Sequence, residues 1–392
     1  MLLQIGEKPV QKFPFLNLGF RPFFLFASLS GFLLIALWLL QYSGVIGLSN
    51  YYGTTNWHSH EMLFGYTSAV IAGFLLTAVR NWTNAPTIIK APLAAIAAIW
   101  LVARLLPFTS VAGWVVAVVD LSFFLFLAIA IAMPVVKVKQ WKNLIMVIIP
   151  LFFFLANLLV HLFHLGIANT LYAGNMLAIY AIILLLIIMT GRVVPFFTKI
   201  VIKRLEPKEN IALEKFLYVQ LAFLAITDSF GFTPTIVAFF ALLGAIAHMI
   251  RIRTWFAKEL LGVPILWVLH AGYVWMIIGF ILKALAAMEM VGNNLAIHAW
   301  TVGAIGLLTY GMMARVSLGH TGREMKPAKI VEFGFLVIIF AAIIRVIFPM
   351  LSMESYNLWV QLSGILWCLA FVLFIITYTK MYFQVRVDGQ MG

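Results

Sequence analysis

The sequence predicts an all-α membrane protein, a polytopic bundle of twelve transmembrane helices. Of its 392 residues, 64% are hydrophobic and only 10% are charged, whereas soluble domains carry about 25% charged residues. Apolar runs of about twenty residues, the length that crosses a bilayer as a helix, recur along the whole chain. Basic residues fall in alternate connections between these runs, which is typical of the cytoplasmic side of membrane proteins.

The expected helices follow the apolar runs in order. They span approximately residues 22–42, 59–79, 91–108, 112–135, 144–165, 171–191, 212–228, 232–250, 263–286, 294–314, 329–350 and 356–382. The first run is too long for the apolar core of a secretory signal and lacks a small-residue cleavage pattern, so we expect it to remain as a helix.

Lysine and arginine residues predict the orientation. They follow the even-numbered helices, whereas the connections after odd-numbered helices hold none beyond the helix ends. We therefore expect both termini in the cytoplasm and the 43–57 loop outside. Because this topology also accounts for the net charge of +13, nucleic acid is not an expected partner. The residues concerned are Arg80, Lys90, Lys137, Lys139, Lys142, Arg192, Lys199, Lys203, Arg204, Lys208, Arg251, Arg253, Lys258, Arg323, Lys326 and Lys329.

Three basic residues depart from this pattern, because Arg104, Lys283 and Arg345 fall toward the outer ends of their helices. Each long side chain could extend along its helix and place its charge at the membrane interface. Alternatively, a basic residue at this depth could neutralise the carboxylates of a buried cofactor. The sequence leaves both interpretations open.

Several residues repeat at fixed offsets along the chain. Four residues have an identical partner 238 positions later. A middle set of residues, which includes Asn175, lies 123 positions before corresponding residues in the last part of the chain. We therefore predict three pseudo-symmetric four-helix repeats near 1–140, 141–260 and 261–392, within a single transmembrane domain and with sites at the repeat interfaces. The pairs are His60 and His298, Gly65 and Gly303, Gly73 and Gly311, and Thr83 and Thr321.

Histidines give the strongest chemical signal, because His58, His60, His161, His164 and His298 all fall at outer helix ends. His161 and His164 share a helix face, whereas His58 and His60 would point apart in a helix, so we expect His58 in the turn before it. Imidazole without thiolate favours haem iron, copper or non-haem iron. We expect His60 and His298 in one metal site, with one imidazole as a haem ligand and others holding copper.

Glu61 is the only acid that we place beside these histidines. It could orient an imidazole through its second nitrogen, and it is our candidate proton donor if the site carries out a reaction. Taken alone, each histidine is better explained as an interfacial residue, and the metal interpretation rests on five histidines at one depth. The cytoplasmic His248, His270 and His320 give a weaker metal signal.

Arginines also mark the cytoplasmic ends of helices, with Arg21 at the start of the first and Arg315 at the end of the tenth. Anchoring at the membrane surface accounts for each of them alone. Arg315 lies five residues before His320, however, and its guanidinium could pair with a haem propionate or an anionic substrate.

Several strings of residues resemble the NnrS family. They are Gly-Phe-Arg-Pro-Phe-Phe (19–24), Trp-His-Ser-His-Glu-Met (57–62), Ala-Gly-Phe-Leu-Leu-Thr-Ala-Val (72–79), Asn-Trp-Thr (81–83), Leu-His-Ala-Gly-Tyr-Val-Trp (269–275), His-Ala-Trp-Thr-Val-Gly-Ala-Ile-Gly (298–306) and Ala-Arg-Val-Ser-Leu-Gly-His-Thr-Gly-Arg (314–323). The resemblance covers nearly the whole chain. It departs at Arg80, where the family often has proline.

The resemblance implies a bacterial inner-membrane protein of twelve helices that contains haem, of the b type, and copper, and that acts in the response to nitric oxide. His161 corresponds to a family histidine that follows an Asn, here Asn157. By matching motif, the implied cofactor residues are His58, His60, His270, His298 and His320, with Arg21 and Arg315 as neighbours.

The residues and the resemblance together predict a haem–copper membrane protein that binds and detoxifies nitric oxide. A nitric oxide reductase-like reaction would convert two molecules to nitrous oxide and would need an electron donor that the sequence does not identify. Two alternatives stay open. The repeats and interior charges would suit a transporter of metal, haem or a small anion, and a non-catalytic sensor or scavenger would bind nitric oxide without turnover.

Overall fold

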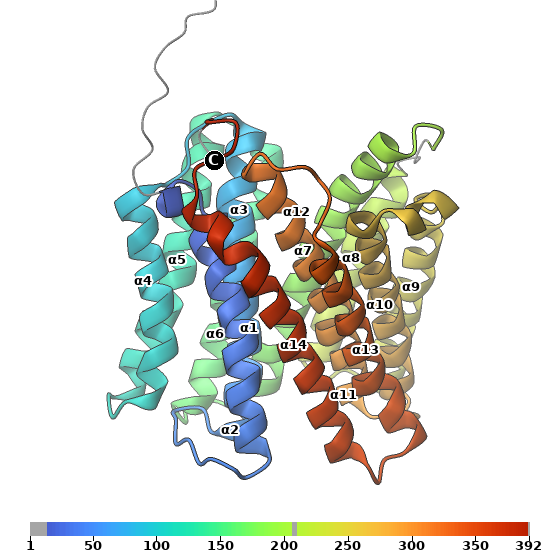
Figure 1. Cartoon of the computed structure of the whole chain (residues 1–392). Helices are drawn as coiled ribbons and strands as arrows, with labels where there is room; N and C mark the ends of the chain where they lie inside the picture. The colour runs from blue at the N-terminus through green and yellow to red at the C-terminus, as the bar shows by residue number, and fades with distance from the viewer. Residues whose placement is uncertain (1–13, 206–209, 391–392) are drawn as a thin grey trace, which may run out of the picture.

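The computed structural model describes residues 14–205 and 210–390, and every regular element in these ranges is a helix. The long helices stand side by side and run between the two ends of one bundle (Figure 1). They are α1 (Phe20–Tyr42), α2 (Thr54–His60) continued by η2 (Glu61–Thr67) and α3 (Ser68–Thr83), α4 (Lys90–Leu105), α5 (Gly113–Lys137), α6 (Ile145–His164), α7 (Leu171–Val201), α8 (Ile211–Ser229), α9 (Pro234–Ile252), α10 (Pro264–Ala287), α11 (Asn293–His298) continued by η6 (Ala299–Ile305) and α12 (Gly306–His320), α13 (Lys329–Leu351) and α14 (Tyr356–Phe383). Short helical turns are η1 (Pro14–Leu16), η3 (Leu106–Phe108), η4 (Trp141–Asn143) and η5 (Lys258–Gly262).

Among the described residues, eleven helical segments are long and apolar enough to cross a membrane. The remaining predicted helix, expected at 212–228, is present as α8, which has 19 residues. It carries three charged residues, Glu214, Lys215 and Asp228, and these keep it out of the apolar set. The all-α prediction is confirmed, and this is the architecture of a multi-pass membrane protein.

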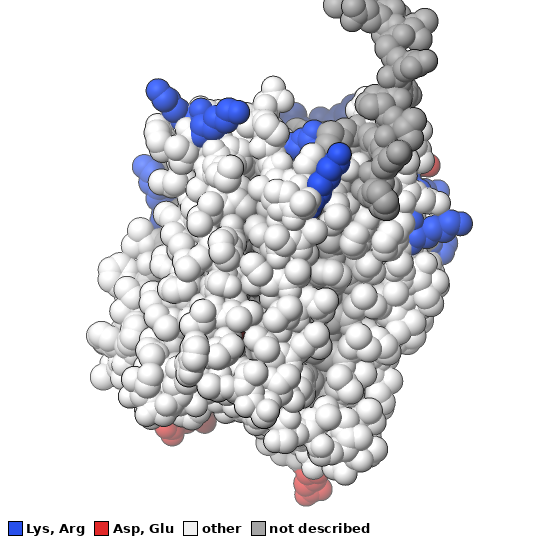
Figure 2. All heavy atoms as spheres, turned by 90° about the vertical axis from the view of Figure 1, so that its left-hand side faces the viewer, with Lys and Arg blue, Asp and Glu red and all other residues white. Residues whose placement is uncertain are grey.

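Charge distinguishes the two ends of the bundle. Exposed lysines and arginines gather at the end where α1 begins and α14 ends, as Figure 2 shows for one face. We call this the basic end, and we expect it to face the cytoplasm. Exposed acids, Glu289 and Glu354, lie in connections at the opposite end. One predicted basic-end residue, Lys208, lies outside the described residues.

Two helices are interrupted by π-helical turns at corresponding places. The segment η2 directly follows His60 and η6 directly follows His298, so the interruptions are separated by the same 238 residues as the repeated histidines. A π-turn accommodates an extra residue within a helix, and such turns occur frequently at functional sites. Both therefore mark the helix positions at which the sequence places candidate ligands.

The three helices that carry the repeated residues pack in the interior. The α2–α3 segment, α7 and the α11–α12 segment are mostly buried, and the hydroxyl groups of Tyr66 and Thr309 lie 2.6 Å apart where two of them meet. A Cβ atom at Gly73 would lie 2.7 Å from the ring of Phe24, so glycine permits this close approach. These three helices thus pack centrally, whereas the threefold repeat stays a prediction.

Candidate metal centre

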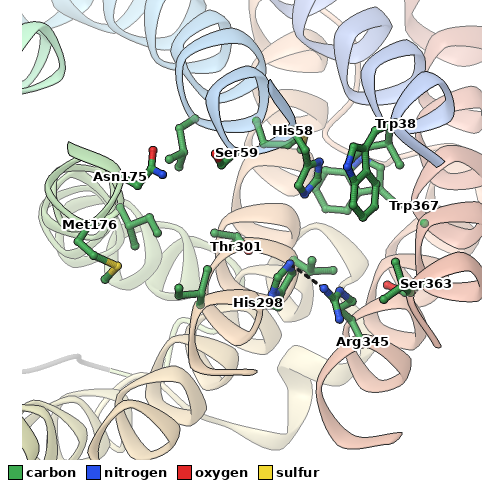
Figure 3. A pocket seen from close by; sticks show the side chains of 18 of the residues that line it. Trp38, His58, Ser59, Asn175, Met176, His298, Thr301, Arg345, Ser363 and Trp367 are labelled. Atoms are coloured by element: carbon green, nitrogen blue, oxygen red, sulfur yellow. Dashed lines mark hydrogen bonds between the residues drawn. The ribbon is translucent and has the colours of Figure 1, made fainter. Parts of the chain in front are cut away.

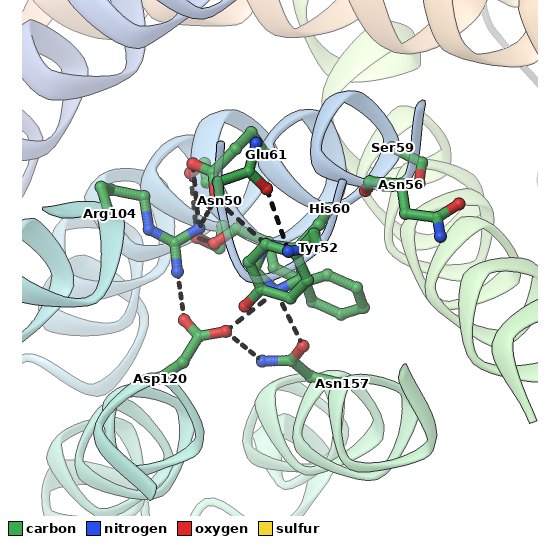
Figure 4. Close-up of polar contacts among 12 residues, drawn as sticks. Asn50, Tyr52, Asn56, Ser59, His60, Glu61, Arg104, Asp120 and Asn157 are labelled. Carbon is green, nitrogen blue, oxygen red and sulfur yellow. Dashed lines mark hydrogen bonds and ion pairs between the residues drawn. The ribbon is translucent and has the colours of Figure 1, made fainter. Parts of the chain in front are cut away.

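Histidine and acid side chains form a buried cluster near the end opposite the basic end, between α2, α5 and α6 (Figure 4). The Nε2 atom of His60 lies 3.0 Å from Oδ2 of Asp120, and Nε2 of His161 lies 3.2 Å from the same oxygen. One ligand atom from each of these residues lies within 4.8 Å of the others. All three residues are at most 1% exposed. Two imidazoles and one carboxylate form a donor set that suits zinc, copper or non-haem iron.

Arg104 from α4 lies between the two acids of the cluster. It forms ion pairs with Glu61, at 3.2 Å, and with Asp120. A buried charge is costly unless it is paired, and one guanidinium compensates only one of two ionised carboxylates. The cluster therefore needs one more positive charge, which either a protonated histidine or a bound metal cation would supply.

Glu61 and Asn157 surround His60 on both sides of its ring. Oε1 of Glu61 lies 3.0 Å from Nδ1 of His60, and Oδ1 of Asn157 lies 3.1 Å from Nε2. Asn157 also donates a hydrogen bond of 2.7 Å to Oδ2 of Asp120. Such contacts fix the orientation of a metal-binding imidazole. The contacts of Glu61, with His60 and Arg104, thus favour an orienting role, and its role as proton donor stays a prediction.

Asp120 is the member of the cluster that sequence analysis does not identify. The conclusion that Glu61 is the only acid beside the outer histidines is therefore wrong. A signal for Asp120 is present in the sequence, because it is the only acid in the apolar helix Gly113–Lys137. An ionisable residue within a membrane helix marks a functional site by default.

Two tyrosines from the connection between α1 and α2 cover the cluster. The ring of Tyr52 stacks on His60 at 4.0 Å between centroids and meets the ring of His164 edge-on at 5.1 Å. Burial, with a smaller effect of the negative charge of Asp120, raises the pKa of Tyr51 to about 12 and raises the pKa of Tyr52 well above its usual value. Both phenols are thus neutral near pH 7 and shield the cluster from the outside.

His58 and His298 lie in a different place, a cavity of about 220 Å³ that we call the outer cavity (Figure 3). The ring of His58 stacks on Trp38 at 4.1 Å. His298 donates from Nδ1 to the carbonyl of Asn294, at 2.6 Å, and its Nε2 accepts a hydrogen bond of 3.2 Å from Arg345. These two contacts together fix a neutral imidazole at His298. Asn175, which the repeat pattern aligns with His298, also lines this cavity.

The structure therefore does not bring His60 and His298 into one site. His60 faces α5 and α6, whereas His58 faces α1 and the outer cavity. His58 and His60 point apart, as expected for two residues of one helix. Because α2 begins at Thr54, His58 is helical, and the prediction that it lies in the turn before the helix is wrong. His164 contacts the covering tyrosines, and its Nε2 atom has no hydrogen-bond partner among the described residues.

The three basic residues at this end of the bundle are buried and engaged in the interior. Arg104 belongs to the metal cluster, and Arg345 contacts His298 and the hydroxyl of Tyr356. Lys283 lies 2.6 Å from Oδ1 of Asp228 on α8. All three side chains are buried and contact interior groups, which argues against the interpretation that they place their charges at the membrane interface.

The remaining predicted residues lie near the basic end, away from the cluster. His270 donates a hydrogen bond of 3.0 Å to the carbonyl of Leu266, one turn earlier in α10. The ring of His320 lies 5.7 Å from that of Phe20. Arg21 donates to three backbone carbonyls where α14 ends, at Met381, Tyr382 and Gln384. Arg21 therefore has a structural role in this chain, because it holds the end of α14 against α1.

A comparison with family models agrees with the resemblance seen in the sequence motifs. The model described as NnrS protein matches residues 14–386, nearly the whole chain. No curated relative matches the chain at a significant level. The chain belongs to the NnrS family.

Proposed function

We propose that this NnrS family member is a membrane metalloprotein that binds nitric oxide, with a copper ion held by His60, Asp120 and His161. The observation that carries the proposal is the buried donor set, in which three ligand atoms lie within 4.8 Å of one another. Two carboxylates, Glu61 and Asp120, share the single arginine Arg104, and this imbalance of charge favours a bound cation at this position. The link to nitric oxide comes from the family, as does the expectation of a bacterial inner membrane.

The identity of the metal follows from chemistry and family together. Imidazole nitrogens and a carboxylate oxygen suit Cu(II), but two histidines and one carboxylate also form the usual ligand set of non-haem iron enzymes. We choose copper because the NnrS resemblance implies it. Among the described residues, the cluster contains no thiolate, since the single cysteine, Cys368, lies on α14.

Haem, the second cofactor that the resemblance implies, needs more room than the outer cavity offers. Pockets for drug-sized ligands have volumes of roughly 300–1,000 Å³, whereas the outer cavity has about 220 Å³. A cavity at the basic end, which we call the inner cavity, has about 570 Å³ and is lined by His320. We propose His320 as the residue that would hold a haem there, where haem iron would supply a second redox centre.

The outer cavity suits a small and nearly apolar molecule such as nitric oxide. Its walls are largely apolar and aromatic, and Ser59, Met62 and Leu63 line it from α2 and η2. Nitric oxide dissolves in lipid, so it needs no water-filled route to such a place. Reduction of two molecules to nitrous oxide and water would consume two electrons and two protons from a donor still to be identified.

Transport is the second candidate function, and the positions of the cavities favour it. Three cavities follow the interface of the three central helices from one end of the bundle to the other. The middle one has about 50 Å³ and is lined by apolar residues such as Val70, Ile182 and Met312, apart from two threonines. A narrow apolar segment between two wider cavities is a usual form of closed gate.

One set of experiments separates these functions. Purified protein, analysed for metal and kept under anaerobic conditions, should change its absorption spectrum when nitric oxide is added. Production of nitrous oxide with a chemical reductant would indicate an enzyme, and binding without turnover would indicate a sensor or scavenger. A metal-loaded protein with an unchanged spectrum would contradict the proposal, and uptake of an anion or metal into proteoliposomes would then support transport.

A further inference from the structure

The inner cavity is a chamber at the basic end of the bundle. It lies between α3, α7, α12 and the segment after α14, and its lining includes Arg80, Arg315, Arg386 and His320. Among the described residues that line it, none is an aspartate or a glutamate. The guanidinium groups of Arg21, Arg80 and Arg386 lie close enough to His320 to act on it electrostatically. Several positive charges in one cleft with apolar walls concentrate a positive potential.

Arg315 differs from the other buried arginines of the described chain. It is only 8% exposed, and its Cζ atom lies 3.0 Å from the ring centroid of Phe197. Arg104 and Arg251 pair with carboxylates, and Arg21 and Arg345 donate hydrogen bonds to oxygen or nitrogen atoms. Arg315 forms no hydrogen bond or ion pair with any described residue. An unpaired buried charge is costly, so a negative partner is to be expected in the cavity.

The walls of the inner cavity limit what that partner can be. Phe74 and Met312 supply apolar surface in the cavity, and the ring of Phe197 lies against the guanidinium of Arg315. Arg386 is partly neutralised already, because its Nε lies 2.8 Å from Oδ1 of Asp388. The volume of about 570 Å³ exceeds the needs of a bare ion. A ligand with both an anionic group and an apolar part would therefore fill the chamber.

We propose that the inner cavity binds an organic anion, whose carboxylate or phosphate oxygens pair with Arg315 and whose apolar part contacts Phe74, Phe197 and Met312. The planar guanidinium group can bind either kind of oxygen pair through two parallel hydrogen bonds. A soluble metabolite, an anionic lipid headgroup and the propionates of a haem share this chemistry. The inference does not depend on a metal at the cluster of His60, Asp120 and His161.

The test compares wild type with Arg315→Gln, both as full-length protein in detergent. Thermal unfolding is measured with increasing inorganic phosphate or succinate, because a ligand that binds only the folded state raises the unfolding temperature. Native mass spectrometry and an absorption spectrum identify any lipid or haem that copurifies. We expect wild type to bind one of these anions. We expect Arg315→Gln to bind the same anion at least tenfold more weakly. Lys326 is exposed at the same end and does not line the cavity, so Lys326→Gln should bind these anions as wild type does.

Each outcome decides the matter. Stabilisation by phosphate or succinate would identify a soluble anion, and loss of a lipid or of a haem absorption band in Arg315→Gln would identify the other two sources. Arg315→Lys, which keeps the charge without the two-pronged geometry, should bind with intermediate strength and covers the case that Arg315→Gln does not fold. Wild type that neither carries an anion nor is stabilised by one would overturn the proposal, as would equal binding by all variants.

Discussion

The Oδ2 atom of Asp120 lies 3.0 Å from the Nε2 atom of His60. This contact joins α5 to α2 across 60 residues of sequence, and both residues are buried. The same oxygen also contacts His161 and Asn157, so a single carboxylate on α5 joins side chains from α2 and α6. The candidate metal centre depends on this arrangement, and the predictions below follow from it.

Replacing Arg104 should leave two buried carboxylates without their common partner. Removing one partner of a buried ion pair typically costs about 3–5 kcal/mol, so we expect Arg104→Met to lower the free energy of unfolding by about that amount. In the double variant Arg104→Met/Asp120→Asn, part of the lost free energy of unfolding should be restored, because the second substitution removes one of the unpaired charges. Chemical unfolding in detergent measures both effects.

A matched control exists at the surface. Arg204 pairs with Glu259, and their side chains are 73% and 48% exposed. Exposed ion pairs contribute about 0–1 kcal/mol, so Arg204→Met should leave stability nearly unchanged. Equal losses for Arg104→Met and Arg204→Met would show that the buried network is not needed for the fold.

Glu61 should affect metal affinity rather than metal capacity. Partners that orient a ligating histidine typically contribute a factor of about 10–100 to affinity, so Glu61→Gln should bind copper more weakly but at the same stoichiometry. A copper titration with a competing chelator measures this, with the exposed Glu289→Gln as control. Unchanged affinity together with lost turnover would instead favour the proton-donor role.

Stability at high pH should depend on Tyr51, which lies outside the helices that cross the membrane. Burial raises its pKa from 10.0 to about 12. A group with a raised pKa in the folded state stabilises the fold fully below its unfolded pKa of about 10, and this contribution is lost as the pH rises toward 12. Tyr51→Phe should therefore reduce the fall in unfolding temperature above pH 10. A fall as steep as that of wild type would exclude Tyr51 as its cause.

The helices and the charge distribution could be predicted because both depend on local sequence. Runs of apolar residues and alternating basic connections need no knowledge of which helices are neighbours. The depth of each histidine followed from the same reasoning. Depth does not determine direction, however, and for this reason His60 and His298 share a level while they face different sets of helices.

Asp120 illustrates what the sequence leaves undetermined. Its contacts with His60, Arg104 and His161 join residues that are 16 to 60 positions apart, and only the packing of α2, α4, α5 and α6 brings them together. The interior position of Arg104 was undetermined for the same reason, because its pairing depends on an acid from another helix. The sequence signal was a lone acid in an apolar helix, which marks a site without naming its partners.

The metal content of His60→Ala and His298→Ala tests the central claim most directly. Both histidines stand immediately before a π-helical turn, so the variants are matched in position, but only His60 belongs to the cluster with Asp120 and His161. Each protein is purified at normal yield and its copper and iron per chain are measured by mass spectrometry. We predict that His60→Ala loses the metal of the cluster and that His298→Ala keeps it. Full metal content in His60→Ala would contradict the assignment.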